Sequence, residues 1–114
     1  VLSEGYYAAY YQQAQRVRAA VRTAMQEALR EADWLLLPTA PTAAFPLGRT
    51  APASERWRAD LCTVPASLAG LPAVSVPRGT DRQGLPLGVQ LVGAAFQEKL
   101  LLNAAHWLEQ GGEK

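Results

Sequence analysis

Two short apolar runs, WLLL at residues 34–37 and AVSV at residues 73–76, constrain most strongly what this chain can fold into. Each run is stopped by a proline, Pro38 or Pro77. Continuous apolar runs of this length are typical of strands buried on both faces of a sheet. Such strands need a covering layer on each side, so the sequence predicts a sheet that lies between other elements.

A third strand is predicted at residues 87–93, where LGVQLVG alternates with a period of two. One face takes Leu87, Val89 and Leu91, and the other takes Gly88, Gln90 and Val92. The preceding RGTDRQGLP segment predicts a turn, with Asp81 and Gly84 as its markers. Together these residues predict a hairpin.

Two main helices flank these strands in the sequence. Residues 6–33 contain no glycine or proline, and apolar positions recur at steps of three and four, which predicts a long helix. The stripe expected to face the core is Tyr7, Tyr10, Ala14, Val17, Val21, Ala24 and Ala28. Residues 98–110 predict a second helix. Its inward positions are expected to be Leu101, Ala104, Ala105 and Leu108.

A further helical segment is predicted between the first two strands. We expect it to start near Glu55 with Ser54 as its N-cap, to break near Pro65, and to end at Gly70. The prolines and glycine between Pro38 and this segment predict an irregular loop.

The order helix, strand, loop, helix, strand, turn, strand, helix predicts an α/β architecture. Three short strands with two main helices leave sheet surface without a partner, and bare sheet edges favour aggregation. We therefore expect residues 1–114 to be one end of a larger sheet domain, an incomplete domain.

Composition excludes several classes of protein. A formal net charge of +1 over 114 residues argues against a dedicated nucleic-acid binder. The single cysteine, Cys62, allows no intrachain disulfide and favours a reducing, cytoplasmic location. No apolar run approaches the roughly 18 residues that span a bilayer, so no membrane contact is expected. The opening VLSEGYY has neither a signal peptide's features nor a methionine, which suggests that something upstream was removed.

Catalytic constellations are hard to find in this sequence. His106 is the only histidine and is expected to be structural or half-exposed, and Cys62 is expected to be a small buried thiol. Lys99 and Lys114 are the only lysines, and neither lies where a lysine base would lose its solvent. There is no Cys/His cluster at metal-ligand spacing and no phosphate-binding glycine motif, so no metal or cofactor is expected.

Two groups in the long helix allow alternatives. Arg16, Arg18 and Arg22 are expected to form a solvated face, with phosphate contact as the alternative. Four tyrosines open the helix: Tyr6, Tyr7, Tyr10 and Tyr11. Their amphipathic rings suit a core margin or an interface. Core packing is favoured for Tyr7 and Tyr10, and at least one of the four is expected to contact another part of a larger assembly.

Asp60 stands before the apolar segment TVPASLAGLP and is the main candidate binding residue. Taken alone, the residues favour a helix cap or a surface salt bridge with Arg56 or Arg58. The alternative is a carboxylate that faces a pocket lined by residues 63–72 and holds an ammonium group.

Four blocks of the chain resemble the C-terminal part of the amidase signature family. They are GYYAAYYQQAQRVR (5–18), DWLLLPTAPTAAFPLG (33–48), DLCTVPASLAGLPAVSVP (60–77), and GLPLGVQLVG (84–93) with FQEKLLLNAAHWLEQ (96–110). The opening block is most similar to the tRNA-dependent amidotransferase branch of that family. The resemblance implies an α/β fold with a mixed sheet covered by helices.

The resemblance also implies a function. The family uses two serines and a lysine for acyl transfer, and these lie in a Gly/Ser-rich segment that this sequence lacks, so no catalytic residue is expected here. In the amidotransferase branch an aspartate at the position of Asp60 contacts the α-amino group of glutamine. The parent would release ammonia from glutamine to amidate Glu-tRNA or Asp-tRNA. Its B and C subunits would be partners, with tRNA only indirectly involved.

Other functions stay open at this point. A stand-alone amidase acting on another small amide is one alternative, and a non-catalytic truncated domain is the other. Ser67 stands where the family usually has asparagine, which weakens the assignment to one branch. Gln97 replaces a common aspartate cap, a loss worth about 1 kcal/mol.

Overall fold

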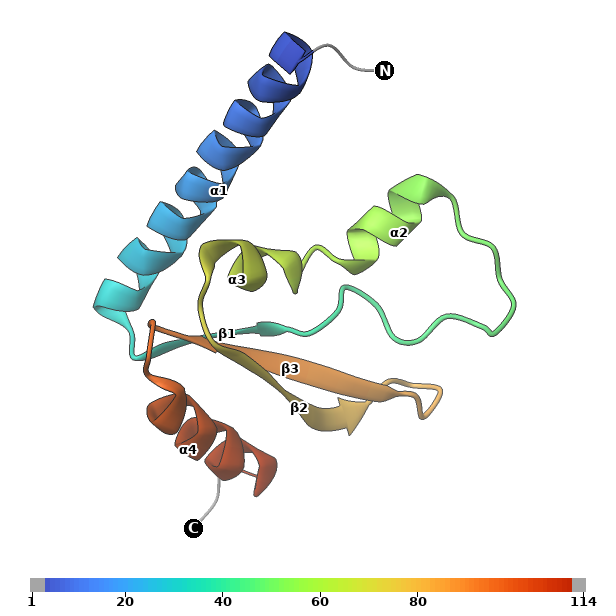
Figure 1. Ribbon diagram of the computed structural model, residues 1–114. Helices are drawn as coiled ribbons and strands as arrows, with labels where there is room; N and C mark the ends of the chain where they lie inside the picture. The colour runs from blue at the N-terminus through green and yellow to red at the C-terminus, as the bar shows by residue number, and fades with distance from the viewer. Residues whose placement is uncertain (1–3, 112–114) are drawn as a thin grey trace.

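A computed structural model describes residues 4–111 of the chain (Figure 1). The elements in order are α1 (Glu4–Glu31), β1 (Trp34–Pro38), α2 (Ala53–Ala59), α3 (Val64–Ala69), β2 (Ala73–Thr80), β3 (Pro86–Gly93) and α4 (Glu98–Glu109). The predicted order of elements and the irregular loop before α2 are confirmed. No helix within the described residues is long and apolar enough to span a bilayer.

The three strands form one sheet in the order β1-β3-β2. Both pairs are antiparallel, with Leu36 of β1 opposite Leu91 and Val76 of β2 opposite Val89. The described part of the sheet is therefore wholly antiparallel, and the mixed sheet implied by the family resemblance is not seen among residues 4–111. β3 lies in the centre, because it pairs with β2 through the hairpin and with β1 from the other side.

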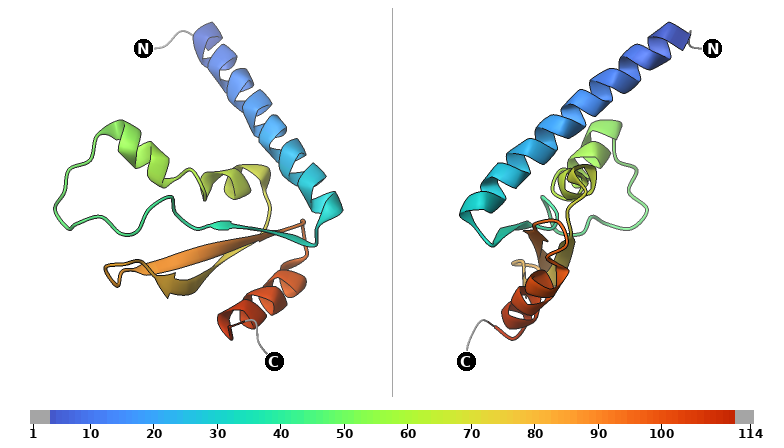
Figure 2. Two further views of the ribbon diagram at one scale, coloured as in Figure 1. Left: turned by 180° about the vertical axis from the view of Figure 1, so that it is seen from behind. Right: turned by 60° about the vertical axis from the view of Figure 1, so that its left-hand side comes forward.

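Helices cover both faces of this sheet (Figure 2). On one face α1 and α3 pack over a cluster of Ala66, Ala69, Leu71 and Val92, joined by Met25, Leu29, Leu35 and Leu37. On the other face α4 packs over Val76, Leu91, Leu101 and Ala105, joined by Trp34, Val74, Val89, Ala104 and Leu108. The α/β class and the inward residues of the last helix are confirmed.

The alternation predicted for the third strand is also confirmed. Leu91 and Val92 are both 0% exposed, and they pack into the clusters on opposite faces of the sheet. β2 is less enclosed than its apolar run predicts, since Ala73 and Ser75 are exposed. β1 is also less enclosed than predicted, since Leu36 is 55% exposed. The reason is positional, because β1 is an edge strand and α4 covers β2 and β3 rather than the full width of the sheet.

The long helix is confirmed, but Val21 is the one residue of the expected inward stripe that is half-buried, and the others are exposed. The half-buried positions are Val21, Met25 and Leu29, spaced by four, and Met25 and Leu29 pack against the cluster next to α3. Figure 1 shows why: only the C-terminal half of α1 lies beside α3 and β1, while its N-terminal half projects away. Tyr7 and Tyr10 are therefore 63% and 62% exposed rather than packed in the core.

The segment between β1 and β2 differs from the prediction at its start and at its break. Pro52 occupies the N-cap of α2 and no side chain caps that end, so Ser54 is not the cap. The break comes before Pro65, which lies in the first turn of α3, where a missing N–H costs nothing. Gly70 ends α3 as predicted, at φ +70°, with the Leu71 N–H donating to the Ala66 carbonyl at 3.1 Å.

The turn between β2 and β3 is confirmed but is shorter than predicted, because β2 continues past Pro77 to Thr80 and β3 begins at Pro86. Asp81 Oδ1 accepts hydrogen bonds from the Gln83 N–H at 2.8 Å and the Leu85 N–H at 2.9 Å. Gln97 at the start of α4 makes no side-chain cap hydrogen bond, which agrees with the weaker cap expected at this position.

The central position of β3 generates a stability prediction. Leu91→Ala should lower the free energy of unfolding by about 2–5 kcal/mol, because a fully buried leucine would leave a cavity under α4. Leu47→Ala is the matched control, since Leu47 is fully exposed and should change the value by less than about 0.5 kcal/mol. Denaturant titration measures both, and equal effects would contradict the placement of β3.

Candidate functional site

Asp60 lies in a tight turn, residues 60–63, that joins α2 to α3. Its backbone shapes the turn: the Asp60 N–H donates to the Trp57 carbonyl at 3.2 Å, and its own carbonyl accepts from the Thr63 and Val64 N–H groups at 3.2 and 3.0 Å. The carboxylate itself is exposed. The turn therefore fixes where the side chain starts, while solvent surrounds its charged end.

The cap and the salt bridge favoured by the residues alone are not formed. Asp60 occupies the C-cap of α2, and its contribution to the helix end is made by the backbone. Among residues 4–111 the ion pair is Arg49–Glu55 at 3.0 Å, and neither Arg56 nor Arg58 pairs with Asp60. The Asp60 carboxylate is thus left open to a partner that the described chain does not supply.

A shallow, open hollow of about 330 Å³ lies at this turn, and Asp60 is one of its lining residues. Its lining is mostly apolar and consists of Trp57, Asp60, Leu61, Val64 and Pro65. The predicted pocket wall is therefore only partly correct. Val64 and Pro65 of the TVPASLAGLP segment do line the hollow, whereas Ala66, Ala69 and Leu71 turn into the core under α3.

Three polar residues, Gln90, Ser75 and Thr39, form a polar row on the face of the sheet below this turn. Gln90 in β3 is 4% exposed, and its Nε2 donates to the Cys62 carbonyl at 2.7 Å. Opposite it in β2, Ser75 Oγ lies 2.7 Å from Thr39 Oγ1, above Gly88. The alternation of the strand predicted that Gln90 lies on this face but assigned it no role. The signal in the sequence was a polar residue between the apolar residues Val89 and Leu91.

The other candidate residues do not assemble into a site. Cys62 is half-buried rather than buried, and what it contributes is its backbone carbonyl. His106 and Lys99 are exposed on α4, and Lys114 lies outside the described residues. Arg18 donates from Nε to the Leu68 carbonyl at 2.8 Å, so it ties α1 to α3. No three His, Cys, Asp or Glu side chains of the described part of the chain lie together as metal ligands.

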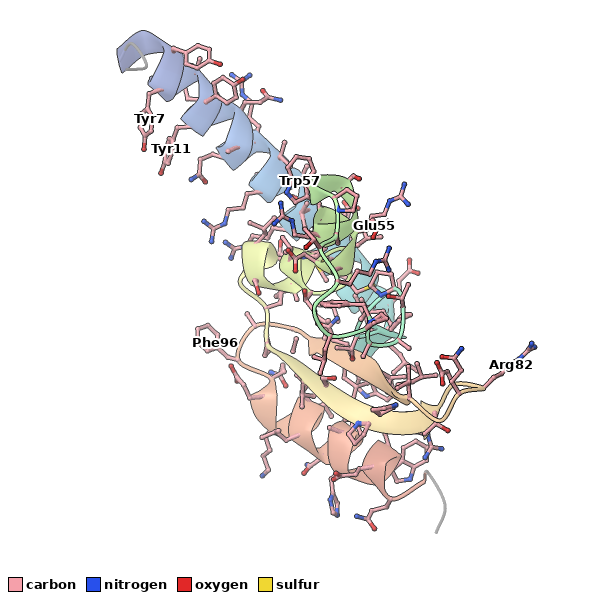
Figure 3. All side chains as sticks on the ribbon, turned by 90° about the vertical axis from the view of Figure 1, so that its right-hand side faces the viewer. Tyr7, Tyr11, Glu55, Trp57, Arg82 and Phe96 are labelled. Carbon is pink, nitrogen blue, oxygen red and sulfur yellow. The ribbon has the colours of Figure 1, made fainter. Side chains whose placement is uncertain are left out.

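The tyrosines form an exposed group at the free end of α1. Figure 3 shows Tyr7 and Tyr11 standing out from this end of the helix, well away from the sheet. The rings of Tyr6 and Tyr10 lie 4.6 Å apart, and a hydrogen bond with Tyr10, with a smaller contribution from desolvation, raises the pKa of Tyr6. All four tyrosines are exposed, and the contact of at least one of them with another part of an assembly stays a prediction.

A second hollow, of about 840 Å³, lies between the irregular loop and α2. It is lined by Pro41, Thr42, Phe45, Arg49, Thr50, Ala51, Glu55, Arg56, Arg58 and Ala59. The Arg49–Glu55 ion pair joins its two sides. No pattern in the sequence predicted this hollow, because an irregular loop has no periodicity from which its path can be inferred.

Comparison with known proteins gives a consistent family match. The family model described as Amidase matches residues 1–102. The chain is 55% identical over 111 residues to the A subunit of glutamyl-tRNA(Gln) amidotransferase from Rhizorhabdus wittichii, covering 96% of this chain and 22% of that protein. The same subunit of Synechococcus sp. (strain CC9311) is 50% identical over 113 residues, covering 98% of this chain and 23% of that protein. The chain thus spans less than a quarter of the length of the curated relatives it matches.

Two solved structures share the fold. The crystal structure of the glutamyl-tRNA(Gln) amidotransferase A subunit from Thermotoga maritima superposes with a TM-score of 0.78 at 39% identity, over 85% of this chain and 21% of that one. An inhibitor-bound complex described in connection with the origins of an s-triazine catabolic enzyme gives a TM-score of 0.76 at 33% identity, over 91% and 24%. The arrangement of helices on both faces of the sheet therefore matches a part of larger proteins.

The polar row generates a prediction at Gly88. A Cβ added there would lie 3.0 Å from Thr39 Oγ1 and 3.2 Å from Ser75 Oγ, so Gly88→Ala must push the two hydroxyls apart. We expect the free energy of unfolding to fall by about 1–3 kcal/mol. Gly5→Ala in α1 is the control, because nothing lies within 4 Å and alanine favours the helix. Thermal unfolding of both variants measures the difference, and a Gly88→Ala protein as stable as wild type would contradict the packing described here.

Proposed function

Because the chain belongs to the amidase family, we propose that it forms the C-terminal segment, within an incomplete domain, of the A subunit of a tRNA-dependent amidotransferase. The identity of 55% over 96% of the chain to such a subunit is the observation that supports this most directly. In this proposal the segment supplies part of the glutamine pocket and of the core, and the catalytic groups belong to the rest of the subunit.

Asp60 is the proposed contact for substrate. A carboxylate attracts the α-ammonium group of glutamine, and the pair becomes stronger as water is excluded. In the open hollow beside Trp57 and Leu61 solvent screens this charge. We infer that the remainder of the domain closes the hollow and places the carboxylate against the substrate.

The proposed reaction is acyl transfer from the glutamine side chain. A serine hydroxyl adds to the carboxamide carbon, a second serine and a lysine pass its proton to the leaving nitrogen, and the C–N bond breaks to release ammonia. Water then hydrolyses the acyl-serine ester and releases glutamate. Backbone N–H groups stabilise the oxyanion in both steps. None of these groups is assigned to a residue of this chain.

Partners follow from the same proposal. The B and C subunits of an amidotransferase would receive the ammonia and amidate Glu-tRNA(Gln) or Asp-tRNA(Asn), so tRNA contact by this segment would be indirect. The exposed tyrosines of α1 offer a surface for the rest of such an assembly. The unpaired Cys62 fits a reducing cytoplasmic compartment.

A stand-alone amidase remains the second candidate. Ser67 departs from the asparagine that is usual in the family, which weakens the assignment to the amidotransferase branch. Ammonia transfer to a partner subunit separates the two candidates, since a stand-alone amidase would release all of its ammonia to solvent. The third candidate, a non-catalytic truncated domain, would show neither activity.

The substrate contact can be tested with Asp60→Asn in a complete subunit that contains this segment, assayed with its partner subunits. Loss of the charge should raise the KM for glutamine about 10- to 100-fold, the range for a charged hydrogen bond. Asp33→Asn, the same change at another exposed aspartate, is the control. Because Asp60 is exposed, the free energy of unfolding should change by less than about 0.5 kcal/mol. An unchanged KM would refute the assignment of Asp60.

A second test concerns the isolated 114-residue chain. It should release no ammonia from glutamine above the buffer rate, because the proposed nucleophile and base belong to the rest of the subunit. A coupled glutamate dehydrogenase assay measures the ammonia, with the complete subunit as the positive control. Ammonia release that survives repurification of the chain would overturn the division of roles.

A further inference from the structure

We propose that Gln90 is a positioning residue that holds the turn bearing Asp60 at a fixed place above the sheet. The proposal rests on the assignment of Asp60 to the substrate ammonium and adds a residue that does not itself touch substrate. One hydrogen bond, from Gln90 Nε2 to the Cys62 carbonyl, connects the buried centre of the sheet to the turn. The exposed carboxylate of Asp60 lies on the same turn, two residues before Cys62.

Gln90 is placed where a polar side chain is costly. It lies in the central strand, between residues packed into the apolar clusters, and only 4% of it is exposed. A buried amide without a partner costs about 1–3 kcal/mol, so its hydrogen bond is required rather than incidental. Because the Cys62 carbonyl can only accept, the Gln90 side chain must present its NH₂ group to the turn.

The turn has few other attachments to the sheet. α2, which precedes it, contains no buried residue. α3, which follows it, is held through Ala66 and Ala69, both beyond the turn. Among residues 4–111, the hydrogen bond from Gln90 is the one that joins residues 60–63 to a strand. Without it, residues 60–63 would make no hydrogen bond to the sheet, and their connection to the sheet would run through α3.

The neighbouring polar groups leave the Gln90 amide free for this role. Ser75 lies directly opposite Gln90 in the ladder, but its hydroxyl is engaged with Thr39 at 2.7 Å. The Ser75 hydroxyl is therefore hydrogen-bonded to Thr39 on the side away from Gln90. The Gln90 amide can then donate to the carbonyl of Cys62, which lies two residues after Asp60. This hydrogen bond would fix the distance between the turn and the sheet.

Position matters for a charge that must contact a small ligand. The attraction between a carboxylate and an ammonium group depends on their separation and on the exclusion of water between them. A turn that moves by about 1 Å would keep its charge but lose a direct contact. Gln90 would therefore act on substrate affinity while leaving the chemistry of bond cleavage unchanged.

The test uses Gln90→Met and Gln90→Glu in the complete subunit with its partner subunits. Methionine keeps the length of the side chain without a donor, and an ionised glutamate keeps its shape but can only accept. We expect the KM for glutamine to rise about 3- to 10-fold in each folded variant while kcat stays within about twofold, because one neutral hydrogen bond is lost. Two variants of different polarity are used so that the KM can still be measured in one of them if the other folds poorly.

Arg18→Met is the matched control. Arg18 also donates from a side chain to a backbone carbonyl, at 2.8 Å to Leu68, but it tethers α3 at the end far from Asp60. It should leave the KM for glutamine unchanged. If Arg18→Met and Gln90→Met raise the KM equally, Gln90 acts only through general stability and the proposal fails.

Amide hydrogen exchange gives a readout that does not depend on activity. In the complete subunit the Thr63 and Val64 N–H groups, which bond to the Asp60 carbonyl, should exchange at least about tenfold faster in Gln90→Met, whereas amides in α4 should keep their rates. Unchanged exchange at Thr63 and Val64 would overturn the proposal. If Asp60→Asn alone has no effect on KM while exchange still rises, the assignment of Asp60 fails and the link between Gln90 and the turn stands.

Discussion

The burial of β3 on both faces of the sheet is the constraint on which the rest of the structure depends. Leu91 and Val92, adjacent in sequence and both fully enclosed, must point into separate apolar clusters, so the sheet needs helices on both faces. α4 covers one face directly after the strand, while α3 and the C-terminal half of α1 cover the other. Gln90 is a polar residue buried among these apolar neighbours. Its polar side chain is tolerated because the Cys62 carbonyl lies within reach, and this requirement ties the α2–α3 turn to the best-packed part of the chain.

Away from β3, several large apolar side chains are exposed to solvent. Trp57, Phe45 and Tyr7 are each more than 60% exposed, and they lie on α2, on the irregular loop and on the free half of α1. These surfaces are the expected counterpart of a chain that spans 22% of its curated relative. In such relatives an additional three quarters of the polypeptide is available to bury them. Of these three side chains only Trp57 also lines the hollow at Asp60, so it is the one that a closed pocket would cover in the proposed function.

Sequence reasoning succeeded where one local rule decides the outcome. The glycine at position 70 ends α3 because few other residues adopt its positive φ, and the alternation around Gln90 follows from the period of a strand. It failed where tertiary contact decides. The stripe through Tyr10 and Val17 is as apolar as the one through Met25, and only the position of α3 determines which of them is covered. Similarly, the place of Asp60 in the chain was evident, but its exposure and its link to Gln90 depend on a contact 28 residues away along the chain.

The location of Asp60 is itself informative when weighed against helix energetics. A negative charge at a helix C-terminus faces the negative end of the dipole, an arrangement that is unfavourable by about 0.3–1 kcal/mol even in longer helices. Arg56 and Arg58 occupy the last turn of α2, where cations are favoured, yet neither pairs with this carboxylate. The charge of Asp60 is therefore unfavourable for the C-terminal end of α2 and forms no ion pair there. The Asp60 carboxylate is exposed and unpaired among residues 4–111, so the cationic ligand proposed for it would not have to displace an ion pair of this segment.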